Sequence, residues 1–195
     1  MKDPLSGLDA AVLAGGRSRR FGSDKTRLSA DGEGILARTV RILREAGFPR
    51  VRIVGGEDRA VPGAEFLPDD APGLGPAGGI ATVLRPADEG VFVVGGDMPA
   101  LSVPLIKAVI AAWDGRASVA APRRDGRWEP LCALYSRCAL PEAERAAREG
   151  RSLQDVLNEL GAQEVVLTED FYAGLINVNT PEEWETYLKC SGKSA

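Results

Sequence analysis

Short apolar runs of strand length alternate along this chain with longer segments of helical periodicity. The predicted strands are 8–13, 51–54, 91–94, 118–121, 131–135, 164–167 and a short 175–178. Most of these runs are continuously apolar, which is typical of strands buried on both faces of a parallel sheet.

The predicted helices are 35–46, 77–84, 104–112, 141–148, 153–160 and 181–189. The first has its apolar residues on one face and Gly47 at its end, and Thr180 with Pro181 favours a capped start of the last. The alternation predicts a single α/β domain over 1–195, with a mostly parallel sheet in the middle of three layers. Ligands of such sheets bind at the carboxyl ends of the strands.

The segment 13–25, Leu-Ala-Gly-Gly-Arg-Ser-Arg-Arg-Phe-Gly-Ser-Asp-Lys, directly follows the first predicted strand. Its glycines let backbone amides approach an anion, and its arginines and lysine add positive charge, so the segment predicts a polyphosphate-binding loop. The alternative is a solvated basic turn. The spacing fits neither G-x-x-x-x-G-K-[ST] nor G-x-G-x-x-G, which disfavours a Walker-type kinase and a dinucleotide-dependent dehydrogenase.

A carboxylate follows the strand predicted at 91–94, in the sequence Gly95-Gly96-Asp97-Met98-Pro99. In the predicted sheet, Asp97 would lie at the same edge as the glycine-rich loop. Mg²⁺ usually takes one or two protein carboxylates and shares its other positions with phosphates and water. Asp97 is therefore a candidate Mg²⁺ ligand, and the alternative is a turn aspartate before a proline.

Three further segments carry candidate site residues. The glycine- and proline-rich stretch 68–80 contains Asp69 and Asp70, whose carboxylates could accept hydrogen bonds from guanine, although composition alone favours an ordinary loop. The stretch 127–137 predicts a strand that lines one wall, with Glu129 at its mouth. Asn177 and Asn179 would face the same side of a strand, and turn and cap chemistry is the alternative.

Composition excludes several classes of function. The net charge of −4 argues against general nucleic-acid binding and requires local positive charge for an anionic substrate. The absence of histidine excludes histidine acid–base catalysis and histidine metal sites. Three cysteines without metal or disulfide spacing predict a reducing, cytoplasmic setting, and we expect neither a signal peptide nor a membrane span.

Taken together, five motifs resemble those of the molybdenum cofactor guanylyltransferases, nucleotidyltransferases built on a Rossmann-like sheet. They are L-A-G-G-x-S-x-R-F-G-x-D-K, G-L-G-P-A-G-G-I, G-G-D-M-P, E-P-L-C-A-L-Y-S and N-V-N-T-P-E-E, which extend over about 8–184. The resemblance implies transfer of GMP from GTP to the terminal phosphate of molybdenum-molybdopterin. The products would be molybdopterin guanine dinucleotide and pyrophosphate.

The resemblance also implies roles for individual residues. GTP would be bound by Leu13, Ala14, Gly15, Gly16, Lys25, Asp69 and Asp97, with Asp97 also holding Mg²⁺. Arg19, Lys25 and Asp97 would be catalytic, and Asn177 and Asn179 would face the molybdopterin. Whether Asp69 or Asp70 meets the nucleotide stays open. The family further implies an accessory GTP-binding protein and apo-molybdoenzymes as candidate partners.

Two other functions stay open at this point. One is a related nucleotidyltransferase that uses CTP or another phosphorylated acceptor. The other is a nucleotide-binding regulatory module without turnover, which the presence of both Lys25 and Asp97 disfavours.

Overall fold

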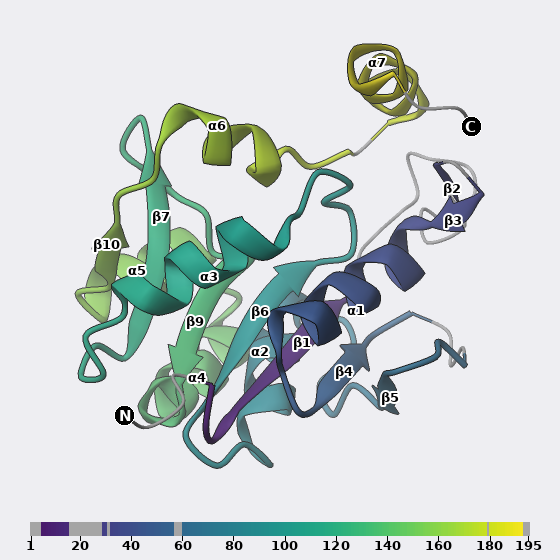
Figure 1. The fold of residues 1–195 in the computed structure, drawn as a ribbon. Coiled ribbons are helices and arrows are strands. Elements are labelled where there is room, and N and C mark those ends of the chain that lie inside the picture. Colours follow the sequence, from purple (N-terminus) through teal and green to yellow (C-terminus); the bar gives the residue numbers. More distant parts are fainter. Residues whose placement is uncertain (1–4, 16–28, 31, 57–59, 179, 193–195) are drawn as a thin grey trace.

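The computed structural model describes residues 5–15, 29–30, 32–56, 60–178 and 180–192, and their central element is an eight-stranded mixed sheet between two helical layers (Figure 1). The sheet order is β10-β7-β9-β6-β1-β4-β5, with β8 paired to β7. The strands are β1 (Leu8–Leu13), β4 (Val51–Val54), β5 (Glu65–Leu67), β6 (Gly90–Gly95), β7 (Val119–Arg124), β8 (Arg127–Trp128), β9 (Cys132–Ser136) and β10 (Gln163–Val165). The predicted three-layer α/β fold is confirmed.

Helices cover both faces of the sheet. They are α1 (Ile35–Ala46), α2 (Gly75–Leu84), α3 (Val103–Ala112), α4 (Leu140–Glu149), α5 (Leu153–Glu159), α6 (Glu169–Tyr172) and α7 (Pro181–Ser191), with short 3₁₀ turns η3 (Arg137–Ala139) and η4 (Ala173–Leu175). A small hairpin, β2 (Ser29–Ala30) and β3 (Glu33–Gly34), precedes α1. Within the described residues, no helix combines the length and the apolar character that crossing a bilayer requires.

The two faces of the sheet build two separate cores because successive side chains of a strand point to opposite sides. On β1, Ala10 and Val12 pack in the core that also contains residues of α1 and α3. Ala11 and Leu13 pack in the second core, with residues of α2, α4 and α5. Both sets are buried, which explains why the strand is apolar along its whole length.

Local sequence signals set several helix ends where they were predicted. Gly47 ends α1 in the left-handed conformation, with φ of 109°. At the start of α7, the Thr180 hydroxyl accepts a hydrogen bond from the Glu183 backbone N–H and the Glu183 carboxylate accepts one from the Thr180 N–H, a complete capping box.

One predicted strand needs correction. The segment 175–178 is not a strand: it begins at the end of η4 and continues as irregular chain. Its apolar residues are buried for other reasons, since Leu175 packs in the core on the α1 and α3 side and Val178 packs with Trp184 of α7. The sheet is mostly parallel, as predicted. β9 runs antiparallel to β6 and β7, and β8 runs antiparallel to β7, because the short connections through β8 cannot make a parallel crossover.

A buried ion pair lies near the amino end of β1, away from the carboxyl edge of the sheet. Asp9 is 1% exposed and accepts hydrogen bonds from Arg52 Nη1 at 2.5 Å and Arg50 Nε at 2.8 Å. The Arg52 side chain is itself only 9% exposed. The two charges therefore depend on each other for compensation.

We expect Asp9→Ala to lower the free energy of unfolding by about 3 kcal/mol, because it leaves the buried Arg52 guanidinium with only the exposed Glu65 carboxylate, 4.0 Å away. Urea denaturation measures this change. Asp88→Ala is the control: Asp88 also pairs with Arg50, but its side chain is 71% exposed, so its loss should cost less than about 1 kcal/mol. Equal losses in the two variants would contradict the assignment.

Candidate functional site

Four loops meet at one edge of the sheet because the strands that precede them are parallel neighbours. β1 pairs in parallel with β4 and β6, so that Leu13 lies opposite both Val54 and Gly95, and β5 pairs in parallel with β4. The carboxyl ends of all four strands therefore lie side by side (Figure 1). β1 is followed by the start of the glycine-rich loop and β4 by Gly55. β5 is followed by Asp69 and β6 by Asp97.

The backbones that follow β1 and β4 approach each other without any side chain between them. The Ala14 N–H donates to the Val54 carbonyl at 2.9 Å. Gly55 has φ of +78°, and a Cβ placed on it would lie 2.7 Å from the Gly15 Cα. This close approach leaves exposed backbone at Gly15, where a ligand can meet main-chain atoms directly.

The start of α2 packs against the same strand end. A Cβ on Gly79 would lie 3.2 Å from Leu13 Cδ2, so this glycine lets the helix lie close to β1. The N-cap residue Leu74 makes no side-chain capping hydrogen bond. Because α2 leads from the carboxyl end of β5 back to the start of the parallel strand β6, its positive N-terminal end lies at the edge where the glycine-rich loop begins.

Asp97 lies at the middle of this edge, on a loop that neighbouring elements hold in place. The Gly96 N–H donates to the Leu13 carbonyl at 3.1 Å, and the Val178 N–H donates to the Asp97 carbonyl at 2.9 Å. Two residues after Asp97, the Pro99 carbonyl accepts hydrogen bonds from Arg38 Nε and from the Tyr187 hydroxyl. These bonds hold the backbone of the half-buried Asp97 beside the end of β1.

The chemistry of the donors around Asp97 agrees with a metal shared between protein and substrate. Among the described residues, no three Cys, Asp or Glu side chains are grouped in a way that could enclose a metal ion. A divalent ion at Asp97 would thus take at most two such side chains from these residues and the rest of its oxygens from phosphates and water. Mg²⁺ is usually bound in this way.

Asp69 and Asp70 have different surroundings. Asp69 Oδ1 accepts hydrogen bonds from the Ala71 N–H at 3.0 Å and from the Thr82 hydroxyl at 3.4 Å. Asp70 is exposed and forms an ion pair with Arg85 at 2.6 Å. Asp69 therefore stays close to α2 and the end of β5, whereas the Asp70 charge is compensated on the surface.

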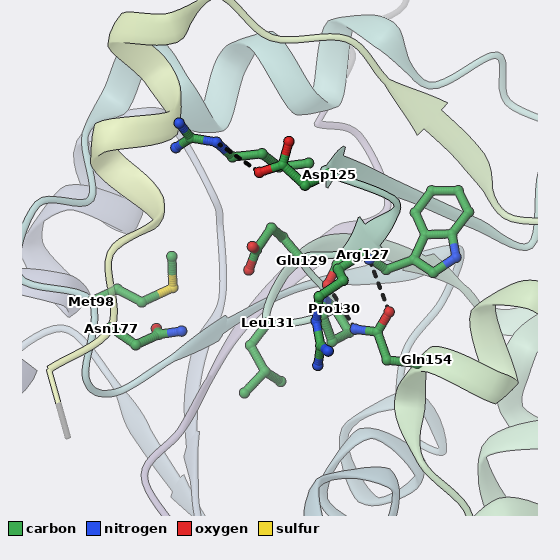
Figure 2. Close-up of a pocket in the computed structure, with 10 residues that line it drawn as sticks. Met98, Asp125, Arg127, Glu129, Pro130, Leu131, Gln154 and Asn177 are labelled. Carbon is green, nitrogen blue, oxygen red and sulfur yellow. Dashed lines mark hydrogen bonds and ion pairs between the residues drawn. The ribbon is translucent and has the colours of Figure 1, made fainter.

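On the other side of Asp97, an open pocket of about 390 Å³ lies over β9 and the β7–β8 hairpin. Figure 2 shows the Glu129 carboxylate pointing into this pocket toward Met98 and Asn177. The complete lining is Met98, Arg124, Asp125, Arg127, Trp128, Glu129, Pro130, Leu131, Gln154 and Asn177. Met98 lines the pocket and directly follows Asp97 in the sequence, so the pocket is adjacent to the candidate metal site.

The structure brings together most of the predicted site residues that it describes. Leu13, Ala14, Gly15 and Asp97 lie at the ends of two paired strands, and Asp69 lies further along the same edge. Asn177 lines the pocket, although not from a strand. Gly16, Arg19, Lys25 and Asn179 lie outside the described residues, and their roles stay predictions from the sequence.

Some residues of this edge were not assigned from the sequence. Gly55 matters through its close approach to Gly15, and Arg124 and Gln154 reach the pocket from β7 and α5. The Asp125-Gly126 pair was an available signal for the hairpin, because this dipeptide favours the two-residue turn that joins β7 to β8. No sequence pattern indicated that α5 lies beside it.

We expect Gly55→Ala to lower nucleotide affinity at least about tenfold, because its Cβ must push Gly15 away. Gly56→Ala is a matched control, since Gly56 also has positive φ (+74°), but a Cβ there would lie 3.4 Å from its nearest neighbour, the Ala14 carbonyl oxygen. Both variants carry a similar backbone strain of about 1–2 kcal/mol. Calorimetric titration with GTP measures the difference, and equal affinities would show that the close approach is not needed.

Comparisons with known proteins show the family to which this chain belongs. Residues 10–165 match the family model described as the MobA-like NTP transferase domain. The chain is 37% identical to the probable molybdenum cofactor guanylyltransferase of Opitutus terrae, over 94% of this chain and 96% of that protein. It is 34% identical to the molybdenum cofactor guanylyltransferase of Xanthomonas euvesicatoria, over 91% and 92%.

A solved structure shares the fold. The crystal structure of molybdopterin-guanine dinucleotide biosynthesis protein A from Archaeoglobus fulgidus superposes with a TM-score of 0.77, covering 94% of this chain and 98% of that chain at 24% identity.

Proposed function

Because the chain belongs to the MobA-like NTP transferase domain family and is a nucleotidyltransferase, we propose that it transfers GMP from GTP to the terminal phosphate of molybdenum-molybdopterin. Pyrophosphate leaves. The observation that carries this proposal is the place of Asp97, between the close backbone approach of Gly15 and Gly55 on one side and a pocket on the other. An enzyme that joins two substrates needs such a divided site.

In this proposal the nucleotide lies over the ends of β5, β4 and β1, and the acceptor lies over β9 and β7. The uncapped start of α2 and the exposed backbone at Gly15 favour phosphates on the nucleotide side. Asn177 lies on the acceptor side, as does the positive charge of Arg124 and Arg127 at the rim of the pocket.

The main obstacle to the reaction is repulsion between the phosphates of the two substrates. Two unit charges 4 Å apart repel each other by roughly 4 kcal/mol at an effective dielectric constant near 20. A Mg²⁺ ion at Asp97 would offset this charge and stabilise the charge that develops on the leaving pyrophosphate. Lys25 and Arg19, predicted from the sequence, would add positive charge from the glycine-rich loop.

The acceptor phosphate attacks the α-phosphorus in line with the departing pyrophosphate. This phosphate is already ionised at neutral pH, so the reaction requires no general base, and a chain without histidine can carry it out. Catalysis then rests on positioning and on preorganised charge. The rigid Asp97 loop supplies part of that positioning.

Purified protein with GTP, molybdenum-molybdopterin and Mg²⁺ should release pyrophosphate, and CTP or ATP should support a much lower rate. This measurement also decides between GTP and the alternative of a CTP-dependent nucleotidyltransferase. Equal rates with CTP would contradict guanine specificity. GTP binding without pyrophosphate release from any acceptor would favour a regulatory module.

We expect Asp97→Asn to reduce magnesium-dependent turnover by at least about 10²-fold, because the amide keeps the size of the side chain but removes its charge. Steady-state pyrophosphate release at several Mg²⁺ concentrations measures this loss. The melting temperature should stay within a few degrees of the wild-type value. A loss of activity below threefold would contradict a metal-binding role, and a collapse of the fold would favour a structural one.

Asp69→Asn and Asp70→Asn form a matched pair that tests the base contact. If Asp69 accepts hydrogen bonds from guanine, its replacement should raise KM for GTP by about 5- to 100-fold, the effect of losing about 1–3 kcal/mol. Asp70 is paired with Arg85 on the surface, so Asp70→Asn should change KM by less than about twofold. The reverse order would assign the base contact to Asp70.

A further inference from the structure

The pocket beside Asp97 contains a carboxylate that the reaction does not use. Glu129 is half-buried, and among the described residues no side chain donates a hydrogen bond to its carboxylate or forms an ion pair with it. Burial raises the pKa of Glu129, and the nearby Arg127 and Arg124 oppose this effect. Hydrogen-bond donors from a ligand would offset the cost of burying this carboxylate.

The backbone around Glu129 is held rigidly. The Glu129 N–H donates to the Pro122 carbonyl at 2.9 Å, and the Pro130 carbonyl accepts from the Tyr135 hydroxyl at 2.8 Å. On the preceding residue, the Trp128 N–H and carbonyl both bond to the Gln154 side chain, at 2.9 and 2.8 Å. Glu129 therefore projects from a fixed segment, and binding a ligand there costs little ordering of the loop.

The other pocket carboxylate has a different setting. Asp125 lies at the turn between β7 and β8, its side chain is 93% exposed, and it pairs with Arg124 at 3.8 Å. Figure 2 shows it at the rim, separate from Glu129. Met98, Pro130 and Leu131 add apolar atoms to the lining. This combination of apolar lining atoms and one inward carboxylate suits a heterocycle with two adjacent N–H donors.

We propose that Glu129 is a specificity-determining residue of this pocket, whose carboxylate accepts hydrogen bonds from the 2-amino group and the N3–H of the acceptor's pterin. This inference rests on the proposed function, which places a pterin substrate on this side of Asp97. Guanine carries a similar pair of donors. The approach of Gly15 and Gly55, the start of α2 and Asp69 all lie on the opposite side of Asp97, which favours the pterin as the partner of Glu129.

The test compares two small probes in the absence of turnover: pterin, followed by its own fluorescence, and lumazine, which has a carbonyl oxygen in place of the 2-amino group. The wild-type protein should bind pterin about 10- to 100-fold more tightly than lumazine, because lumazine keeps the N3–H but loses the charge-assisted hydrogen bond from the 2-amino group and places a carbonyl oxygen against the carboxylate. In Glu129→Gln this ratio should fall to within about threefold, since an amide can donate to the carbonyl of lumazine.

Three controls make the result specific. Asp125→Asn should keep the wild-type ratio, because that carboxylate is exposed and paired with Arg124. The melting temperature of Glu129→Gln should match that of the wild type, since the two side chains have nearly the same shape. The affinity of Glu129→Gln for GTP should change less than about twofold.

Several results would overturn the inference. They are an unchanged pterin-to-lumazine ratio in Glu129→Gln, a wild-type protein that binds neither probe at millimolar concentration, or a loss confined to GTP, which would assign Glu129 to guanine. The transfer assay distinguishes a failure of the inference about Glu129 from a failure of the proposed function. Transfer from GTP with an unchanged ratio contradicts only the role of Glu129, whereas a changed ratio without transfer contradicts only the reaction.

Discussion

The parallel pairing of β1 with both β4 and β6 is the constraint on which the candidate site depends. This pairing aligns Leu13 with Val54 and with Gly95, so the segments that follow three different strands begin at the same edge. The continuous apolar sequence of β1 makes this possible, because the strand must be buried on both faces and paired on both sides. Gly15, where the glycine-rich segment begins, and Asp97 come to the same edge through this arrangement, although more than 70 residues separate them in the sequence.

The antiparallel strand β9 places the pocket next to the edge that carries Asp97. β9 starts at the edge where β6 ends, and the Gly95 N–H donates to the Leu131 carbonyl at 3.0 Å. The β7–β8 hairpin and the Glu129 segment are thereby brought beside Asp97. The site is therefore built from two kinds of connection: parallel strand ends on the nucleotide side and a hairpin on the acceptor side.

The sequence predicted the elements with strong local signals and missed those without them. β1, β4 and α1 have the predicted bounds because their apolar pattern and caps agree with their burial. β5 was missed because it is a three-residue edge strand with partly exposed side chains, and 175–178 was wrongly predicted because Leu175 and Val178 are buried in separate clusters. One wall of the pocket was predicted from the stretch 127–137, but its closure by Gln154 could not be, since it depends on how α5 packs against the hairpin.

A crystal structure with a non-hydrolysable GTP analogue and Mg²⁺ would reveal both halves of the site. We expect the triphosphate against the backbone at Gly15, the ion on the Asp97 carboxylate, and the pocket at Glu129 left to the acceptor. A nucleotide bound in the Glu129 pocket, or an ion held away from Asp97, would contradict it.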